Sequence, residues 1–344
     1  MHGTPPLRSE LFLVLAVLAL ALLLAAGCGE DHSGPIAPKS TNTTALDYGS
    51  RFVPGDSPAM MSAMAAQNRA TPELLKRSGI IGTGTSADAQ GYPVIVVYTS
   101  RPGVAVPATI EGYPTRVNMT GTVIPYAKPG GGGTLQMGTS TGNDLECAAG
   151  TLGCVVIKGG NEYFLSNNHV FARENAGHNG ERIDAPGRYD SHPICDPSPQ
   201  CATLADFQAI SFTSNNTFDA AIAAPSAGRA YTSVEASGYD PSSTVVSPSV
   251  GLAVKKTGRT SNLTHGNIQA INVTIQVQYS NGGIATFVNQ IQTPGSFIRS
   301  GDSGSLMVTE TGANPVGLCF AGGSGGSFAN PIGPVLSRFS ATVK

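Results

Sequence analysis

The pattern of apolar and polar positions divides the chain into segments of different kinds. An unbroken apolar run at residues 11–26 is followed by a polar stretch rich in Ser, Thr, Pro and Gly. Between residues 58 and 79, Met and Leu recur at helical spacing and Thr71-Pro72-Glu73 is typical of a helix start, so we expect one or two helices there. Short apolar runs separated by turn residues fill most of the remainder, which predicts strands.

The predicted strands fall into two groups. Those at 80–84, 93–98 and 113–117 follow the helical segment and predict a small α/β domain at 58–124. A proline followed by four glycines at 129–133 marks a linker, which we place at 125–143. In the remainder, 144–344, we expect strands at 154–158, 163–166, 220–224, 252–257, 273–277, 305–308 and 316–320, and one short helix at 334–339. The predicted fold class is therefore mainly β.

Composition narrows the possible partners. Only 12% of the residues are charged, the net charge is −2, and Lys and Arg form no run. A nucleic-acid partner is therefore not expected, because phosphate binding needs clustered positive charge. Histidines and cysteines do not occur at the spacings of zinc ligands, so we expect neither a metal nor a cofactor.

The N-terminus has the features of an export signal. Arg8 precedes the apolar run, which is shorter than the roughly 20 residues that a membrane span needs. Ala25-Ala26-Gly27-Cys28 follows, and the whole resembles a bacterial lipoprotein signal. This resemblance implies a signal peptide at 1–27, a lipid anchor on Cys28, a tether at 28–57 and a membrane-anchored protein facing the periplasm or the exterior. The alternative is an ordinary secretory signal in which Cys28 is incidental; both interpretations place the body outside the cytosol.

The remaining cysteines suit an oxidising compartment. Cys195 and Cys201 are close in sequence and are predicted to close a short loop, and Cys147 with Cys154 is the second predicted pair. Cys319 lies in an apolar run, so we expect it to be a small buried side chain rather than a reactive thiol.

Three fragments carry candidate chemistry and occur in the order His, Asp, Ser. His169 follows an apolar strand and two asparagines, Asp219 precedes an apolar strand, and Ser303 lies in a Gly-Asp-Ser-Gly turn. A serine hydroxyl becomes a good nucleophile when an imidazole accepts its proton, and a carboxylate on the other ring nitrogen orients that imidazole. The glycines of the turn allow the amides of Gly301 and Ser303 to converge as an oxyanion hole.

These fragments resemble the trypsin-like serine peptidases, in the form found in exported bacterial members. The resemblance covers residues 145–344, including 254–266 and 315–323 around the nucleophile. It implies a double β-barrel, and a serine endopeptidase that forms an acyl-enzyme on Ser303 and cleaves proteins or peptides outside the cytosol. It also places Phe297 at the base and Gly322 on the wall of an uncharged substrate pocket. The alternative interpretation is that Phe297 only packs inside the second barrel.

The sequence departs from the animal members of that family. Those members mature by cleavage after a basic residue, which frees an apolar N-terminus that reaches the aspartate beside the nucleophile. No Arg/Lys-Ile-Val-Gly-Gly site for such a cleavage precedes Thr151. We therefore expect activity without it, and Asp302 cannot be assumed to play that activating part. Residues 58–123 are a candidate propeptide that covers the cleft or assists folding. Two alternatives stay open: a catalytically weak or self-cleaving surface lipoprotein that binds peptides or proteins, and an inert lipoprotein in which the three motifs are coincidental.

Overall fold

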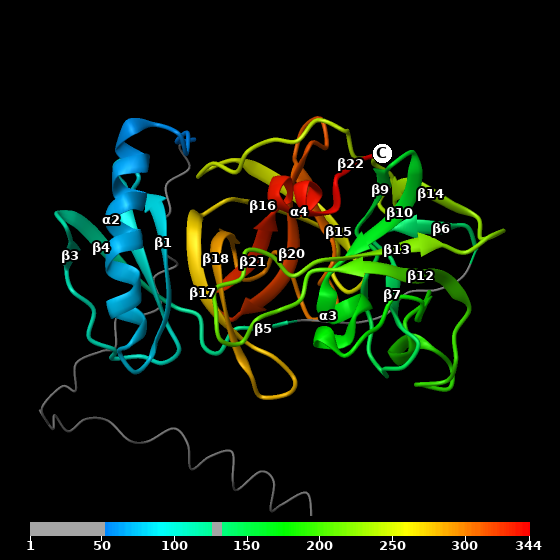
Figure 1. Ribbon diagram of the computed structural model, residues 1–344. Coiled ribbons are helices and arrows are strands. Elements are labelled where there is room, and N and C mark those ends of the chain that lie inside the picture. The colour runs from blue at the N-terminus through cyan, green and yellow to red at the C-terminus, as the bar shows by residue number, and fades with distance from the viewer. Residues whose placement is uncertain (1–51, 126–132) are drawn as a thin grey trace, which may run out of the picture. The chain divides into compact units, whose positions relative to one another are not determined.

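The computed structural model describes residues 52–125 and 133–344 (Figure 1). The chain divides into two compact units, Met1–Ala45 and Leu46–Lys344, and all the described residues belong to the second. The predicted signal peptide, Cys28, most of the tether at 28–57 and part of the linker at 125–143 lie outside the described residues. Within the described ranges, no helix is long and apolar enough to cross a membrane.

The described chain begins with a small α/β segment of one helix and several strands, and a separate α/β domain at 58–124 stays a prediction. Helix α2 (Pro58–Leu75) is one continuous helix, and it packs on β1 (Ile80–Ala87), β2 (Pro93–Thr99) and the short β3 (Thr109–Ile110). Strand β4 (Tyr113–Met119) pairs in parallel with β2. The helix buries Gln67 on its inner face, where the side-chain amide donates to Thr83 Oγ1 at 3.0 Å. This bond offsets the cost of burying a polar group.

The rest of the described chain is mainly β and forms two large curled sheets, as expected for a trypsin-like double β-barrel. The first has eight strands in the order β22 (Ala341–Val343), β9 (Cys154–Lys158), β10 (Asn161–Ser166), β13 (Ala221–Pro225), β12 (Gln200–Phe207), β11 (Arg182–Asp184), β7 (Ser140–Asn143) and β8 (Gly150–Thr151). The second sheet begins at one edge with β16 (Asn262–Asn267). It then runs, in order, through β15 (Ala253–Gly258), β19 (Leu306–Thr309), β20 (Pro315–Gly323), β21 (Gly326–Pro331), β18 (Ile284–Thr293) and β17 (Ala270–Gln278). A small parallel pair, β6 (Leu135–Met137) and β14 (Tyr231–Glu235), accompanies them.

The second sheet does not end at β17, because β1 of the α/β segment pairs with β17. Gly82 lies opposite Ile275 and Thr83 opposite Thr274, so β1, β2, β4 and β3 extend one twelve-stranded sheet. The backbones approach closely: a Cβ at Gly82 would lie 2.2 Å from the carbonyl oxygen of Thr274. Glycine is therefore required at position 82. Backbone pairing joins the α/β segment to the rest of the second sheet.

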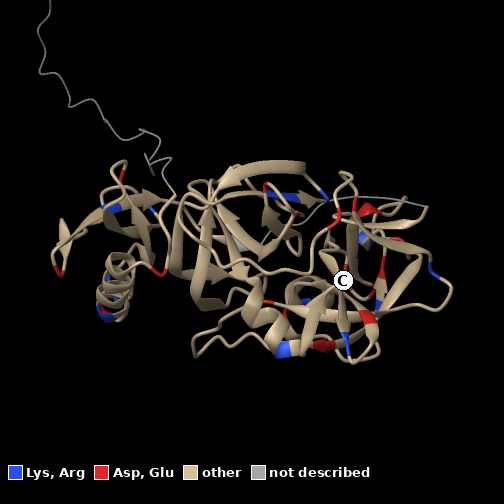
Figure 2. Ribbon diagram, turned by 90° about the horizontal axis from the view of Figure 1, so that it is seen from above, with Lys and Arg blue, Asp and Glu red and all other residues tan. Residues whose placement is uncertain are grey.

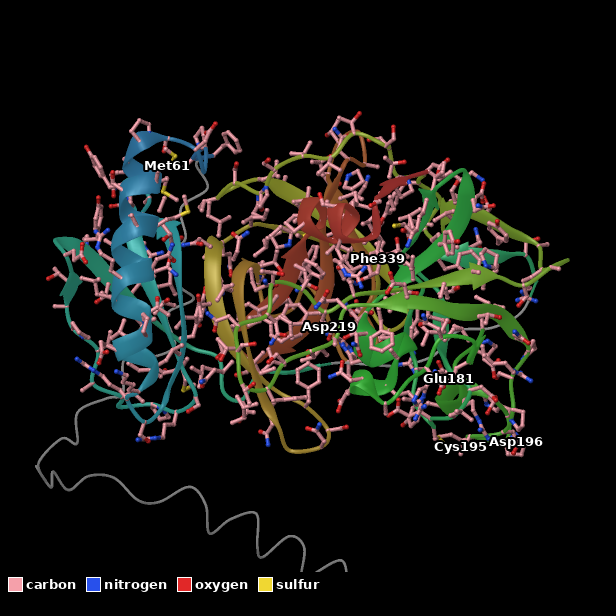
Figure 3. The ribbon with its side chains drawn as sticks, viewed as in Figure 1. Met61, Glu181, Cys195, Asp196, Asp219 and Phe339 are labelled. Carbon is pink, nitrogen blue, oxygen red and sulfur yellow. A yellow bond between two sulfur atoms is a disulfide. The ribbon has the colours of Figure 1, made fainter. Side chains whose placement is uncertain are left out.

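An apolar cluster joins the two curled sheets. It includes Leu165 and Phe218 from the first sheet region, Leu306 and Leu318 from the second, and Phe339 of the C-terminal helix α4 (Ile332–Phe339). Figure 3 labels Phe339 of this cluster. Burial of large apolar side chains is the main stabilising contribution in such a core, so the region between the sheets is held firmly.

The predicted disulfide pairings are wrong. The structure pairs Cys147 with Cys195, with Cα atoms 5.1 Å apart, and leaves Cys154, Cys201 and Cys319 as buried thiols. Cys154 and Cys201 lie on β9 and β12, whose side chains at these positions are buried in apolar clusters. The loop that carries Cys195 instead folds back, and the amide of Cys195 donates to the carbonyl of Arg188 at 2.9 Å. The expected burial of Cys319 is confirmed.

Candidate active site

A short helix positions the candidate base. Strand β10 ends at Ser166, and α3 (Asn168–Phe171) carries His169 on its first turn. The two preceding asparagines fix this turn: the Asn167 side-chain amide donates to the Asp219 carbonyl at 2.7 Å, and that of Asn168 to the Gln208 carbonyl at 2.6 Å. The Asn-Asn-His sequence therefore ties the histidine to both neighbouring strand ends.

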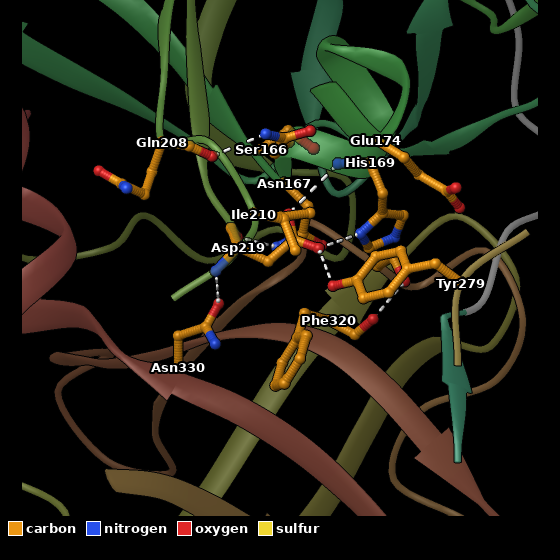
Figure 4. Close-up of polar contacts among 12 residues, drawn as sticks. Ser166, Asn167, His169, Glu174, Gln208, Ile210, Asp219, Tyr279, Phe320 and Asn330 are labelled. Carbon is orange, nitrogen blue, oxygen red and sulfur yellow. Dashed lines mark hydrogen bonds and ion pairs between the residues drawn. The ribbon is translucent and has the colours of Figure 1, made fainter. Parts of the chain in front are cut away.

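Asp219 lies against this histidine and is fully buried. Its Oδ2 accepts a hydrogen bond from His169 Nδ1 at 2.6 Å, and its Oδ1 accepts the His169 backbone amide at 3.2 Å (Figure 4). The amide of Asp219 donates to Asn330 Oδ1 at 3.1 Å, which links it to β21 of the second sheet. The predicted His and Asp are thus brought together between the two sheets.

Opposing effects set the pKa of His169. Burial lowers it, since the side chain is only 8% exposed, but the Asp219 carboxylate and the nearby Glu174 and Glu146 together raise it, and the net direction is upward. Within residues 52–125 and 133–344, Nε2 has no hydrogen-bond partner. The ring is therefore oriented and made more basic through Nδ1, and Nε2 is available for proton transfer.

Ser303 lies in a tight turn that only glycine can complete. Gly301 and Gly304 both have positive φ angles, of 106° and 94°. A Cβ at Gly304 would lie 2.1 Å from Ser166 Oγ and 2.3 Å from the Thr151 carbonyl oxygen. The turn is thereby packed tightly against the end of β10, the strand that leads to His169.

The turn that carries Ser303 and the helix that carries His169 are close neighbours. The amide of Thr151 donates to the Ser303 carbonyl at 2.7 Å, and a Cβ at Gly150 would lie 3.0 Å from that same oxygen and 2.4 Å from Val170 Cγ2. The hydroxyl of buried Ser303 donates to the carbonyl of Phe320 at 3.1 Å. In this structure the serine hydroxyl is therefore bonded to the backbone of β20, and the backbone of Ser303 lies close to the residue that follows His169.

Asp302, directly before the candidate nucleophile, has an internal cationic partner. Lys256 Nζ lies 3.3 Å from Asp302 Oδ2, and both side chains are fully buried. Asp302 Oδ1 also accepts the amides of Thr260 at 3.0 Å and Ser261 at 3.1 Å, and the Ser261 hydroxyl donates to Oδ2. A lysine within the body is thus the cationic partner of this carboxylate, and activity without zymogen cleavage stays a prediction.

The residues predicted for the oxyanion hole and the pocket lie in this region. The Gly301 carbonyl accepts the Thr151 hydroxyl at 2.5 Å, and the predicted role of the Gly301 and Ser303 amides stays a prediction. Phe297 is 1% exposed and packs in the core of the second sheet, against Gly266, as in the alternative interpretation. Gly322 lies on β20; its pocket role, like that of Phe297, stays a prediction.

A strand from the N-terminal side occupies part of the β20 edge. Beyond the last residue that pairs with β19, Ala321 lies opposite Pro125 and Gly322 opposite Ile124 of β5 (Ile124–Pro125). The preceding residue, Phe320, is the one whose carbonyl accepts the Ser303 hydroxyl. Chain N-terminal to the body therefore lies on the backbone edge next to the candidate nucleophile.

Sequence reasoning missed one polar neighbour of the candidate pair. The Tyr279 hydroxyl donates to Asp219 Oδ2 at 2.8 Å. Tyr279 lies in the turn between β17 and β18, in no recognisable motif, and only the aromatic residue before a Ser-Asn-Gly-Gly turn hinted at a packed side chain. For metals, the described residues hold no group of three or more His, Cys, Asp or Glu that could bind an ion. Figure 2 shows Lys and Arg scattered over the described ribbon rather than gathered.

Comparison with known proteins gives structural resemblances only. No family model matches the chain, and no curated protein matches it. Among solved structures, a glutamic acid specific serine protease shares 22% identity over 61% of this chain and 100% of its own, with a TM-score of 0.44. Protease A of Thermobifida fusca shares 21% identity over 61% and 98% at 0.42, and an alpha-lytic protease homologue shares 20% over 62% and 100% at 0.45.

Proposed function

We propose that this protein is a serine endopeptidase that uses His169, Asp219 and Ser303. The observation that carries the proposal is the buried Asp219 carboxylate bonded to His169 Nδ1 at 2.6 Å, with the Ser303 turn packed beside the histidine helix. A buried carboxylate in that position fixes the ring tautomer and stabilises the imidazolium that forms during the reaction.

The chemistry would start with a change of hydrogen bond at the serine. The Ser303 hydroxyl leaves the Phe320 carbonyl and donates to His169 Nε2, which takes the proton as the oxygen attacks the peptide carbonyl. The imidazolium then protonates the leaving amine, and an acyl-enzyme remains until water hydrolyses it. The amides of Gly301 and Ser303 would bind the oxyanion, and loss of one such donor typically costs about 10²–10³ in rate.

The proposed site of action is outside the cytosol. The Cys147–Cys195 disulfide suits an oxidising compartment. Lipid anchoring through Cys28 stays part of the proposal, as do protein or peptide substrates and the absence of a nucleic-acid partner. With Phe297 and Gly322 at the pocket, a peptide library is expected to show no preference for Arg or Lys at the cleaved residue.

A fluorophosphonate probe tests the proposal directly. Wild-type protein is expected to gain one covalent adduct on Ser303, and Ser303→Ala to gain none, as read by intact mass. Ser300→Ala is the matched control, because Ser300 is an exposed serine of the same turn, and this variant is expected to label like wild type. Folded wild-type protein that fails to label, or a Ser303→Ala variant that still labels, contradicts the assignment.

The position of β5 favours a second candidate, a weak or self-cleaving enzyme that binds peptides. An extended peptide commonly binds a sheet as an added strand, and Ile124–Pro125 already holds that place on β20. We therefore propose that residues 58–124 act as a propeptide-like domain that covers the site. Casein turnover and intact mass of wild type and Ser303→Ala separate the candidates: mass loss in wild type alone indicates self-cleavage, and steady casein turnover by the uncut chain excludes a blocked site.

A further inference from the structure

A buried tyrosine shares the carboxylate oxygen that holds the candidate base. Tyr279 is 3% exposed, and its hydroxyl donates to Asp219 Oδ2 at 2.8 Å, the same atom that accepts His169 Nδ1 at 2.6 Å. Figure 4 shows the tyrosine hydroxyl and the histidine ring converging on this carboxylate. Burial, followed by the negative charge of Asp219, raises the pKa of Tyr279 well above its usual value, so the hydroxyl keeps its proton and acts as a donor.

Aromatic neighbours fix the direction of this hydroxyl. The Tyr279 ring meets the His169 ring edge to face, with centroids 6.2 Å apart, and contacts Phe212 at 5.8 Å and Phe287 at 6.3 Å. Rings packed on several sides cannot turn without moving their neighbours. The hydroxyl is therefore directed at Asp219 by packing and is shielded together with it from water.

The turn that carries the tyrosine is anchored on both sides. The Gln278 amide donates to the Val123 carbonyl at 3.1 Å, immediately before β5. The Ser280 amide and hydroxyl donate to Glu174 Oε1 at 3.0 Å and Oε2 at 2.7 Å. Glu174 is one of the groups that raise the pKa of His169. Three consecutive residues thus bind the N-terminal segment, the candidate triad and a loop beside the histidine.

We propose that Tyr279 is a positioning residue for the Asp219–His169 pair. Its hydroxyl fixes which carboxylate oxygen faces the imidazole and takes part of the negative charge of that oxygen. The proposal rests on the proposed function, since the pair it positions is the one assigned to proton transfer. The groups that face His169 are Asp219, Tyr279, Glu174 and Glu146, and only the tyrosine hydroxyl is removed in the test below.

Tyr279→Phe removes the hydroxyl and keeps the ring. Hydrogen bonds to charged groups have energies that correspond to about a 10- to 100-fold change in rate, so kcat is expected to fall at least about 10-fold, with KM changed less than about twofold. The carboxylate then acts more strongly on the imidazolium, which raises the pKa of His169 further. The acid limb of the kcat/KM profile is therefore expected to move to higher pH.

Tyr231→Phe is the matched control. The Tyr231 hydroxyl donates to the Glu162 carboxylate at 2.8 Å, away from the candidate triad, so this variant also loses a tyrosine-to-carboxylate bond. Its rate and pH profile are expected to match wild type. Equal losses in both variants, or an unchanged rate and acid limb in folded Tyr279→Phe, overturn the proposal.

A second measurement separates this inference from the proposed function. NMR titration of the His169 imidazole in Ser303→Ala protein needs no turnover, and adding Tyr279→Phe is expected to raise the measured pKa. Site-specific 3-fluorotyrosine at 279, a stronger donor with nearly the same shape, is expected to lower it, which covers the case of a poorly folded Phe variant. If wild type neither labels nor cleaves but the pKa moves as stated, the proposed function fails and the positioning role stands. If wild type cleaves and the pKa does not move, the positioning role fails.

Discussion

The buried ion pair beside the candidate nucleophile gives the sharpest stability prediction. Lys256 and Asp302 are both fully buried, with Nζ and Oδ2 3.3 Å apart. Lys256 Nζ also donates to Ser261 Oγ at 2.6 Å and to the Asn262 carbonyl at 3.1 Å. Lys256→Met keeps most of the length of the side chain and removes its charge, so Asp302 loses its cation without a large cavity forming.

Removal of one partner from a buried ion pair typically costs about 3–5 kcal/mol of unfolding free energy. Asp302 keeps its backbone amide donors, including Arg299 at 2.8 Å, so we expect a loss near the low end, about 3 kcal/mol. Asp302→Asn in the same chain removes the unpaired charge. The double variant is therefore expected to be less destabilised than the sum of the two single variants, by at least about 1 kcal/mol.

Urea unfolding of the four proteins measures this coupling, and the fluorophosphonate labelling rate reports on the turn that presents Ser303. The exposed pair Lys76–Glu73 supplies the control, because Lys76→Met is expected to cost less than about 1 kcal/mol. A loss below about 1 kcal/mol for Lys256→Met, or additive effects in the double variant, refutes the reasoning that this lysine neutralises Asp302.

Three further predictions concern other parts of the body. Glu235 is fully buried, and burial raises its pKa well above 4.5. The folded state therefore retains a proton that the unfolded state loses as the pH rises from about 5. Over that range the Tm of wild type should fall relative to the Tm of Glu235→Gln. Cys147→Ser opens a loop of 48 residues and should lower the unfolding free energy by about 4 kcal/mol in urea titration, with reduced wild type as comparison. Gly304→Ala should abolish labelling and lower Tm, because the new Cβ would lie 2.1 Å from Ser166 Oγ; unchanged values in any of the three contradict the corresponding structural explanation.

Local pattern predicted several elements closely, although it missed others, such as β12, β18 and β21. Strand β9 has the bounds expected from its apolar run, β2 differs by one residue, and the C-terminal helix begins two residues before its predicted start. These elements depend on side-chain periodicity and on turn residues, which are visible in short windows. The candidate His and Asp were also found from local motifs, and the structure places them in hydrogen-bonding contact.

The sequence does not show which distant side chains and strands pair with one another. Cys154 and Cys201 are near other cysteines in sequence, but their strands direct them into cores. The Tyr279 bond to Asp219 spans 60 residues, and no local pattern marks it. Pairing of β1 with β17 and of β5 with β20 depends on which edges the finished sheets leave open, and a strand pattern does not specify its partner.

The union of β1 with β17 also matters for how the chain is made. At ordinary synthesis rates of about 5–20 residues per second, β1 is complete roughly ten seconds or more before β17 exists. During that interval one flank of the early sheet has open backbone donors and acceptors, which favours association with other nascent chains. Once the hairpin of β17 and β18 emerges, the same flank offers it a template, so a strand made early both risks aggregation and guides the pairing of a strand made later.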